Sequence, residues 1–229
     1  MGRKITQIIE DQINAWRHQN RKTRQRPQKK FYPIITVSRE FGALGAALAN
    51  IMGERLGFKV WDNELLYAIS DELGSNEKFL ESVDERRRKL VEDNLLGLMK
   101  DKNTNTNYLL SLNRVVKAIE EVGESIVVGR GAAYICQNEL SFHLRVVSPL
   151  AKRIEGYASR ENISKQQAEK IIQEKDAERD EFVKFSFNRD VNTASDYDLV
   201  INSGTFELEE MADIALRAYS TKIGEPVTS

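Results

Sequence analysis

Short apolar runs alternate with longer amphipathic stretches from residue 31 to about residue 220. The runs are four to seven residues long, include β-branched side chains and end at polar or turn residues, which predicts buried strands. They lie at 34–37, 58–61, 125–128, 142–147 and 197–203.

Between these runs, apolar side chains recur at helical spacing. In 43–56 they fall on one face of a helix, and Gly57 follows where a helix would end. Strands that alternate with helices predict a parallel sheet with helices on both faces. Further helices are predicted at 64–73, 75–122, 150–185 and 207–220, the second of them broken by a polar turn at 101–107.

The first 30 residues form a separate segment by composition. Apolar side chains at helical spacing predict an amphipathic helix over 4–18, and 21–30 is a polar, basic linker. The segment holds nine Lys and Arg against Glu10 and Asp11. We favour a helix that packs on its own domain, on a second copy of the chain or on a protein partner. A basic arm for nucleic acid or an anionic surface stays open, although nucleic acid is not the expected partner.

Composition narrows the class further. The 229 residues suffice for one α/β domain with appendages, and the net charge of −1 gives no general attraction to nucleic acid or membrane. No apolar run approaches the ~18 residues that would span a bilayer, and the start resembles no secretory signal, so we expect a cytoplasmic protein. A single cysteine, Cys136, and two histidines exclude an internal disulfide and a Cys/His zinc cluster; Cys136 is expected to be packed.

The segment after the first predicted strand has the character of a phosphate-binding loop. Its glycines and alanines let the backbone approach an anion at the start of a helix. The pattern G-x-x-x-x-G-K-[ST] is not met, because Glu40 stands at the first glycine, Ala46 at the lysine and Ala47 at the Ser/Thr. From this segment alone, phosphate binding and simple helix–strand packing are equally open.

Five segments taken together resemble the cytidylate kinase-like family, a branch of the P-loop nucleoside monophosphate kinases. They are ITVSREFGALG, GFKVWDNELL, IVVGRGAAYI, RIEGYASRENIS…AEKIIQEKDAERDEF and YDLVINS, and with their spacing the resemblance covers about 33–218. It implies an α/β fold: a three-layer P-loop NTPase-type parallel sheet with helices on both faces, a helical NMP-binding insertion and a lid. The domain would span 31–222, with the insertion at about 75–122, the lid at about 153–190 and a tail at 223–229.

The resemblance also implies an activity. Members transfer the γ-phosphoryl of ATP, with Mg²⁺, to a nucleoside monophosphate, here a pyrimidine nucleotide and first of all CMP. No other metal site is expected. The phosphate loop would comprise Ser38, Gly42, Ala43, Gly45 and Ala46.

The same loop departs from the family at its cation. Many members of this branch have Arg where the usual lysine is missing, but here Ala46 stands at that position. Losing one such donor costs on the order of 3 kcal/mol of barrier, or ~100-fold in rate. Arg39 is the expected substitute. The alternative is a catalytically impaired nucleotide-binding pseudokinase with a regulatory or partner-binding role.

Further site residues follow from the resemblance. Asp62 would lie near the acceptor nucleotide or else cap the next helix. Arg130, at the end of a predicted strand, would bind phosphate rather than form a structural ion pair. The expected lid residues are Arg153, Arg160, Lys175, Asp176 and Arg179, with Arg189 the weakest candidate, and the expected catalytic set is Arg39, Arg130, Arg160 and Arg179.

Overall fold

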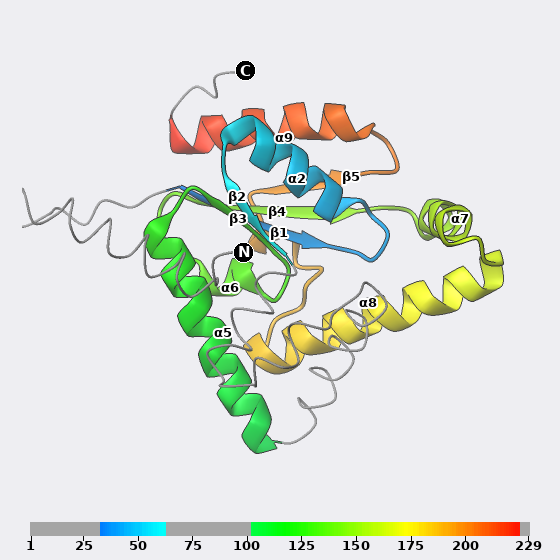
Figure 1. Ribbon diagram of the computed structural model, residues 1–229, viewed down its shortest axis with the longest axis horizontal. Helices are drawn as coiled ribbons and strands as arrows, with labels where there is room; N and C mark the ends of the chain where they lie inside the picture. Colours follow the sequence, from blue (N-terminus) through cyan, green and yellow to red (C-terminus); the bar gives the residue numbers. More distant parts are fainter. Residues whose placement is uncertain (1–32, 63–101, 225–229) are drawn as a thin grey trace, which may run out of the picture. The chain divides into compact units, whose positions relative to one another are not determined.

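The structure, a computed structural model, describes residues 33–62 and 102–224 (Figure 1). The chain divides into two compact units: a helical unit, residues 1–30 with 63–122, and a sheet unit, residues 31–62 with 123–229. The predicted helices at 4–18 and 64–73, the basic linker and most of the predicted NMP-binding insertion lie outside the described residues.

The sheet unit is built on five parallel strands in the order β2-β3-β1-β4-β5. The central strand β1 pairs with β3 and β4, so that Ile34 lies between Ser125 and Ser141. Each predicted apolar run is a strand, which confirms the predicted parallel sheet. The bounds are β1 Ile34–Arg39, β2 Lys59–Trp61, β3 Ser125–Val128, β4 Ser141–Val147 and β5 Leu199–Asn202.

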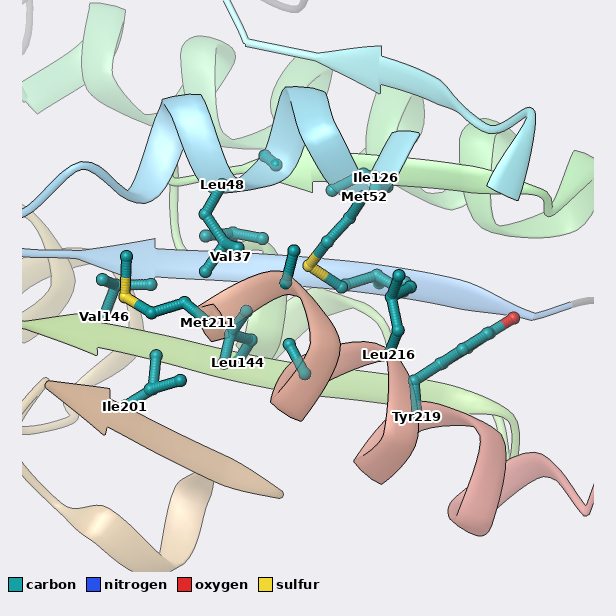
Figure 2. Close-up of a cluster of buried hydrophobic side chains, with 14 of the residues drawn as sticks. Val37, Leu48, Met52, Ile126, Leu144, Val146, Ile201, Met211, Leu216 and Tyr219 are labelled. Atoms are coloured by element: carbon teal, nitrogen blue, oxygen red, sulfur yellow. The ribbon is translucent and has the colours of Figure 1, made fainter. Parts of the chain in front are cut away.

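One face of the sheet is covered by α2 (Gly45–Leu56) and α9 (Leu208–Ile223), which pack on alternate residues of the strands (Figure 1). Figure 2 shows Val37 and Leu144 of the strands in one cluster with Leu48, Met52 and Met211 of the two helices. Each such side chain contributes roughly 1.5–3 kcal/mol when it is fully buried. This cluster is therefore the main core of the sheet unit.

The opposite face of the sheet is more polar. Thr36, His143 and Arg145 alternate with the core residues of β1 and β4, so they point to the side where Figure 1 shows α6 (Ala132–Ile135) and α8 (Lys165–Phe187). The Thr36 hydroxyl and His143 Nδ1 are 2.8 Å apart. Helices thus lie on both faces, as predicted. A short 3₁₀ helix, Ala194–Asp196, precedes β5.

The helical stretch predicted at 150–185 consists of two helices. α7 (Leu150–Glu161) ends where Asn162 adopts the left-handed conformation, with φ 54°. α8 begins after Ser164, whose side chain forms a capping box with Gln167. Asparagine tolerates the left-handed region, and a Ser-x-x-Gln pair is a helix-start signal that the apolar periodicity did not take into account.

The polar turn predicted at 101–107 is wrong over residues 102–107, which are helical. In the helical unit, α5 runs without a break over Lys102–Val122. The Asn and Thr residues at its start have modest helix propensity, but no Gly or Pro interrupts the helix. From Tyr108 onwards, buried side chains recur at helical spacing, at Leu112, Val115, Val116 and Ile119. No helix in the described part of the chain is both long and apolar enough to cross a bilayer.

Candidate active site

The turn between β1 and α2 has a conformation that leaves helix amides available to an anion. Gly42 and Leu44 are left-handed, with φ 81° and 63°. Leu44 is the N-cap of α2, makes no side-chain capping bond, and no acidic residue follows in the first turn. The first amides of an α-helix have no acceptor within the helix, and they carry the positive end of its dipole. The first amides of α2 therefore lack a side-chain cap, as is typical of a helix N-terminus that faces an anion.

Small residues in the turn let its backbone lie close to neighbouring elements. A Cβ added to Gly45 would lie 2.6 Å from Cβ of Arg39, so only glycine fits at this point. Ala43 is fully buried, and Ala46 packs against the main core. The side chain at the lysine position therefore contributes packing and no charge.

Arg39, at the end of β1, extends across the ends of the neighbouring strands. Its Nη2 lies 3.6 Å from the Asp62 carboxylate, which follows β2. Between them is Gly129, which follows β3, and a Cβ there would lie 1.8 Å from Nη1 of Arg39. The expected substitute cation is thus directed along the carboxyl ends of β3 and β2. Asp62 is an ion-pair partner of Arg39, and the helix that it was expected to cap lies outside the described residues.

Arg130 occupies a tight turn at the carboxyl end of β3. It has φ 53° and lies between two left-handed glycines, Gly129 and Gly131. A Cβ on Gly131 would lie 2.0 Å from the Phe187 ring of α8, which holds this turn against the helix. The structure places Arg130 at the sheet edge where the sequence predicted it.

Arg153 of α7 is buried against the turn, with 8% of its surface exposed. Its Nε donates to the Ser148 carbonyl at 3.0 Å, and its Nη1 donates to the Phe41 carbonyl at 3.1 Å and to Asp176 at 2.5 Å. The Glu40 carboxylate is 3.6 Å from Nε. Expected to contact a ligand, Arg153 instead joins α7, α8 and the turn.

Asp176 and Arg179 of α8 meet the same turn. The Asp176 carboxylate accepts the Phe41 amide at 2.7 Å through one oxygen and Arg153 through the other. The Arg179 Nη1 donates to the Arg39 carbonyl at 3.3 Å, and its guanidinium lies 5.2 Å from the Phe41 ring centre. Both backbone groups of Phe41 are thus bonded to α7 and α8. The D-x-x-R pair of the predicted lid therefore contacts the predicted phosphate loop.

Two further predicted lid residues, Arg160 and Lys175, form ion pairs within their own helices. Arg160 is 55% exposed and bonds to Glu161 of its own helix, while its guanidinium lies over the Tyr157 ring. Lys175 forms an ion pair with Glu178. Arg189 is exposed just after α8.

The family model for the cytidylate kinase-like family matches residues 34–205. The chain belongs to the cytidylate kinase-like family. A cytidylate kinase from Methanothrix thermoacetophila is 28% identical over 185 residues, covering 81% of this chain and 96% of that protein. Membership of this family implies that the protein uses nucleotides.

Solved structures include a protein of similar fold. A protein of uncharacterized function from Eubacterium ventriosum has a TM-score of 0.62 at 18% identity, covering 82% of this chain and 99% of that chain. A shikimate kinase from Acinetobacter baumannii gives a TM-score of 0.46 at 10% identity, covering 83% and 94%. With the family match and the parallel sheet covered on both faces, the predicted fold class is confirmed. The placing of the NMP-binding insertion and the division into domains remain predictions.

Within this cytidylate kinase-like chain, Leu44 stands where the resemblance places glycine in the family loop. It has kept the left-handed conformation, and 43% of its surface is exposed. A non-glycine residue in this conformation costs roughly 1–2 kcal/mol. Such strain collects at functional sites, so its position in the turn is consistent with a binding role.

Two contributors were missed from the sequence. Glu40 accepts the Ser148 amide at 2.7 Å, which ties the turn to the end of β4. The buried Arg145 donates to the Ser38 hydroxyl at 3.1 Å and to Asn192 at 2.9 Å, so the Ser38 side chain is directed to the α8 side of the sheet. The position of Arg145 inside the apolar run 142–147 is a sequence signal that could have identified it.

Burial raises the pKa values of two side chains, Tyr134 of α6 and Asp180 of α8. The pKa of Tyr134 is raised, mainly by burial and then by its hydrogen bond with Tyr197. Burial also raises the pKa of the Asp180 carboxyl, with Arg145 acting in the opposite direction. Tyr134 is therefore neutral at physiological pH.

Proposed function

We propose that this member of the family transfers the γ-phosphoryl of ATP to a pyrimidine nucleoside monophosphate, with CMP as the first candidate. The observation that carries the proposal is the uncapped N-terminus of α2 at the carboxyl end of β1, with the Arg39 guanidinium over the end of the next strand. Amides for one phosphate and a cation beside it are what phosphoryl transfer requires.

The reaction needs positioning more than covalent chemistry. An oxygen of the acceptor phosphate attacks the γ-phosphorus, and the bond from that phosphorus to the β–γ bridging oxygen breaks with its electrons leaving on ADP. In this proposal the amides of residues 42–46 hold the donor phosphates. Arg39, Arg130 and Arg179 offset the charge that the transferred group spreads, and Asp62 lies on the acceptor side.

Mg²⁺ would accompany the ATP phosphates, whose charge it offsets. P-loop enzymes commonly give it a Ser/Thr hydroxyl, but Ala47 stands at that position here. The described residues hold no group of three or more His, Cys, Asp or Glu that could bind a metal. The loop therefore does not fit the usual metal ligand, and we assign no step to the ion.

A second candidate is a nucleotide-binding pseudokinase. Ala46 brings no charge to the loop, and Arg153 and Asp176 bond to the protein itself. These features favour a chain that binds a nucleotide and changes the position of α7 and α8 without efficient chemistry.

The test is turnover of ATP–Mg²⁺ with CMP, UMP, dCMP, AMP and GMP, beside calorimetric binding of each. The first proposal expects ADP formation with a pyrimidine acceptor. It also expects a loss of about 100-fold or more in Arg39→Ala. Arg217→Ala, which changes an exposed arginine on α9, should match the unaltered protein. Binding without turnover would replace the first proposal by the second, and absence of both would contradict the two together.

A further inference from the structure

The guanidinium of Arg39 lies in a slot made by the absence of a side chain at Gly129. A Cβ at Gly129 would lie 1.8 Å from Nη1, 2.8 Å from Cζ and 3.3 Å from Nη2 of Arg39. These distances are below van der Waals contact, so the flat group lies directly against the glycine backbone. Gly129 is itself fixed, because its amide donates to the Val37 carbonyl at 2.9 Å.

The Asp62 carboxylate is another contact of the guanidinium. The two side chains are 19% and 36% exposed, and the Nη2 to Oδ1 distance is 3.6 Å. Ion pairs of this exposure are weak and are screened by salt. A phosphate with two charges can therefore displace Asp62 from Arg39 at little cost.

The position of this pair distinguishes two sides of the turn. In the strand order, β3 and β2 lie on one side of β1, and β4, which leads into α7, lies on the other. Arg153 and Asp176 contact the turn from the α7 and α8 side. Arg39 extends to the opposite side, so its guanidinium faces a phosphate that approaches over β3 and β2.

We propose that Gly129 and Asp62 position Arg39 as the binding group for the acceptor's phosphate. Gly129 is a positioning residue, since it acts through the slot. Asp62 holds the guanidinium until the acceptor phosphate replaces it. This inference rests on the proposed use of a monophosphate acceptor and adds which residue recognises its phosphate.

Gly129→Ala tests the slot, and Gly57→Ala is its matched control. Both glycines have positive φ, at 77° and 68°, so both variants meet the same backbone strain. A Cβ on Gly57 meets nothing within 4 Å, whereas one on Gly129 displaces Arg39. The difference between the variants is thus the position of the guanidinium.

The measurement is calorimetric binding of CMP, of cytidine and of a non-hydrolysable ATP analogue. Gly129→Ala should weaken CMP binding by about tenfold or more, the usual value of a charge-assisted hydrogen bond. Binding of cytidine, which has no phosphate, and of the ATP analogue should stay within about twofold by the same scale. Gly57→Ala should bind all three ligands as the unaltered protein does.

Arg39→Gln provides a second variant that does not depend on the glycine. It should lose the same preference for CMP over cytidine, and adding Gly129→Ala to it should cause no further loss, because both changes remove one contact. Should Gly129→Ala fail to fold, Arg39→Gln still decides the matter.

Unchanged CMP binding in either variant overturns the inference, as does an equal loss for cytidine. Loss of the ATP analogue in place of CMP would put Arg39 on the donor side and also overturn it. An unaltered protein that binds neither nucleotide contradicts the proposed function itself, which is a distinct result.

Discussion

Two arginines flank the turn between β1 and α2, and they are held in opposite ways. Arg153 is buried and donates hydrogen bonds to the Ser148 and Phe41 carbonyls and to the Asp176 carboxylate. Arg39 is more exposed, and its pair with Asp62 is 3.6 Å long. An arginine whose donors are committed to the protein stabilises structure, while one held by a weak, exchangeable partner can accept a ligand. Residue type and sequence spacing alone did not show which of the two arginines is structural and which is available to a ligand.

The largest expected effect is on the buried side. Arg153→Ala should lower the free energy of unfolding by about 3 kcal/mol, because it removes several hydrogen bonds and leaves Asp176 without its cation. Urea denaturation measures it. Arg160→Ala, on the same helix but exposed, should change stability by less than about 0.5 kcal/mol. Equal effects of the two changes on the free energy of unfolding would contradict the structural role of Arg153.

The second turn, at residues 129–131 after β3, lies on the side of Arg39 and should nevertheless be rigid. Gly131→Ala places a Cβ 2.0 Å from the Phe187 ring and should cost about 2 kcal/mol or more. Gly57→Ala, which meets only the strain of positive φ, should cost about 1 kcal/mol. Thermal unfolding of both variants gives the difference. Similar values would mean that Phe187 moves aside freely and that the whole strand-end side is loosely packed.

Leu44 offers a change of the opposite sign. Leu44→Gly should raise the free energy of unfolding by about 1 kcal/mol, since glycine adopts φ 63° without strain. Asn50→Gly, exposed within α2, should lower it by about 0.5–1 kcal/mol. Denaturation of the two variants in guanidinium chloride shows whether each change raises or lowers the free energy of unfolding. A destabilised Leu44→Gly would mean that the exposed side chain makes a contact worth more than the backbone strain.

The smallest stability effect is expected at the exchangeable pair. Asp62→Asn should change the free energy of unfolding by less than about 0.5 kcal/mol, and any change should diminish with added salt. Denaturation at low and high ionic strength tests this. A loss comparable to that of Arg153→Ala would show that Arg39 is a structural arginine after all.

The sheet could be predicted from the sequence because each strand is a continuous apolar run, and Ser125–Val128 was predicted to the residue. The break between α7 and α8 was missed, although Asn162 and the Ser164–Gln167 capping box are local signals. The start of α5 is as polar as a turn, but it contains no Gly or Pro that would end a helix.

The candidate site could be predicted only in part. The turn, the strand ends and the D-x-x-R pair were placed by local pattern and resemblance. The hydrogen bonds that give Arg153 a different role from Arg39 join residues far apart in the chain. Phe41 and Asp176 are 135 positions apart, and Phe41 and Arg153 are 112 apart. No local pattern determines which of several arginines will be buried.

Phe41 links the turn between β1 and α2 to two helices through its own main chain. If α7 and α8 swing outward, an amide and a carbonyl lose their acceptor and donor in the same movement, and water must enter to replace both. Any opening at these two bonds would therefore also expose both main-chain groups of Phe41 to water.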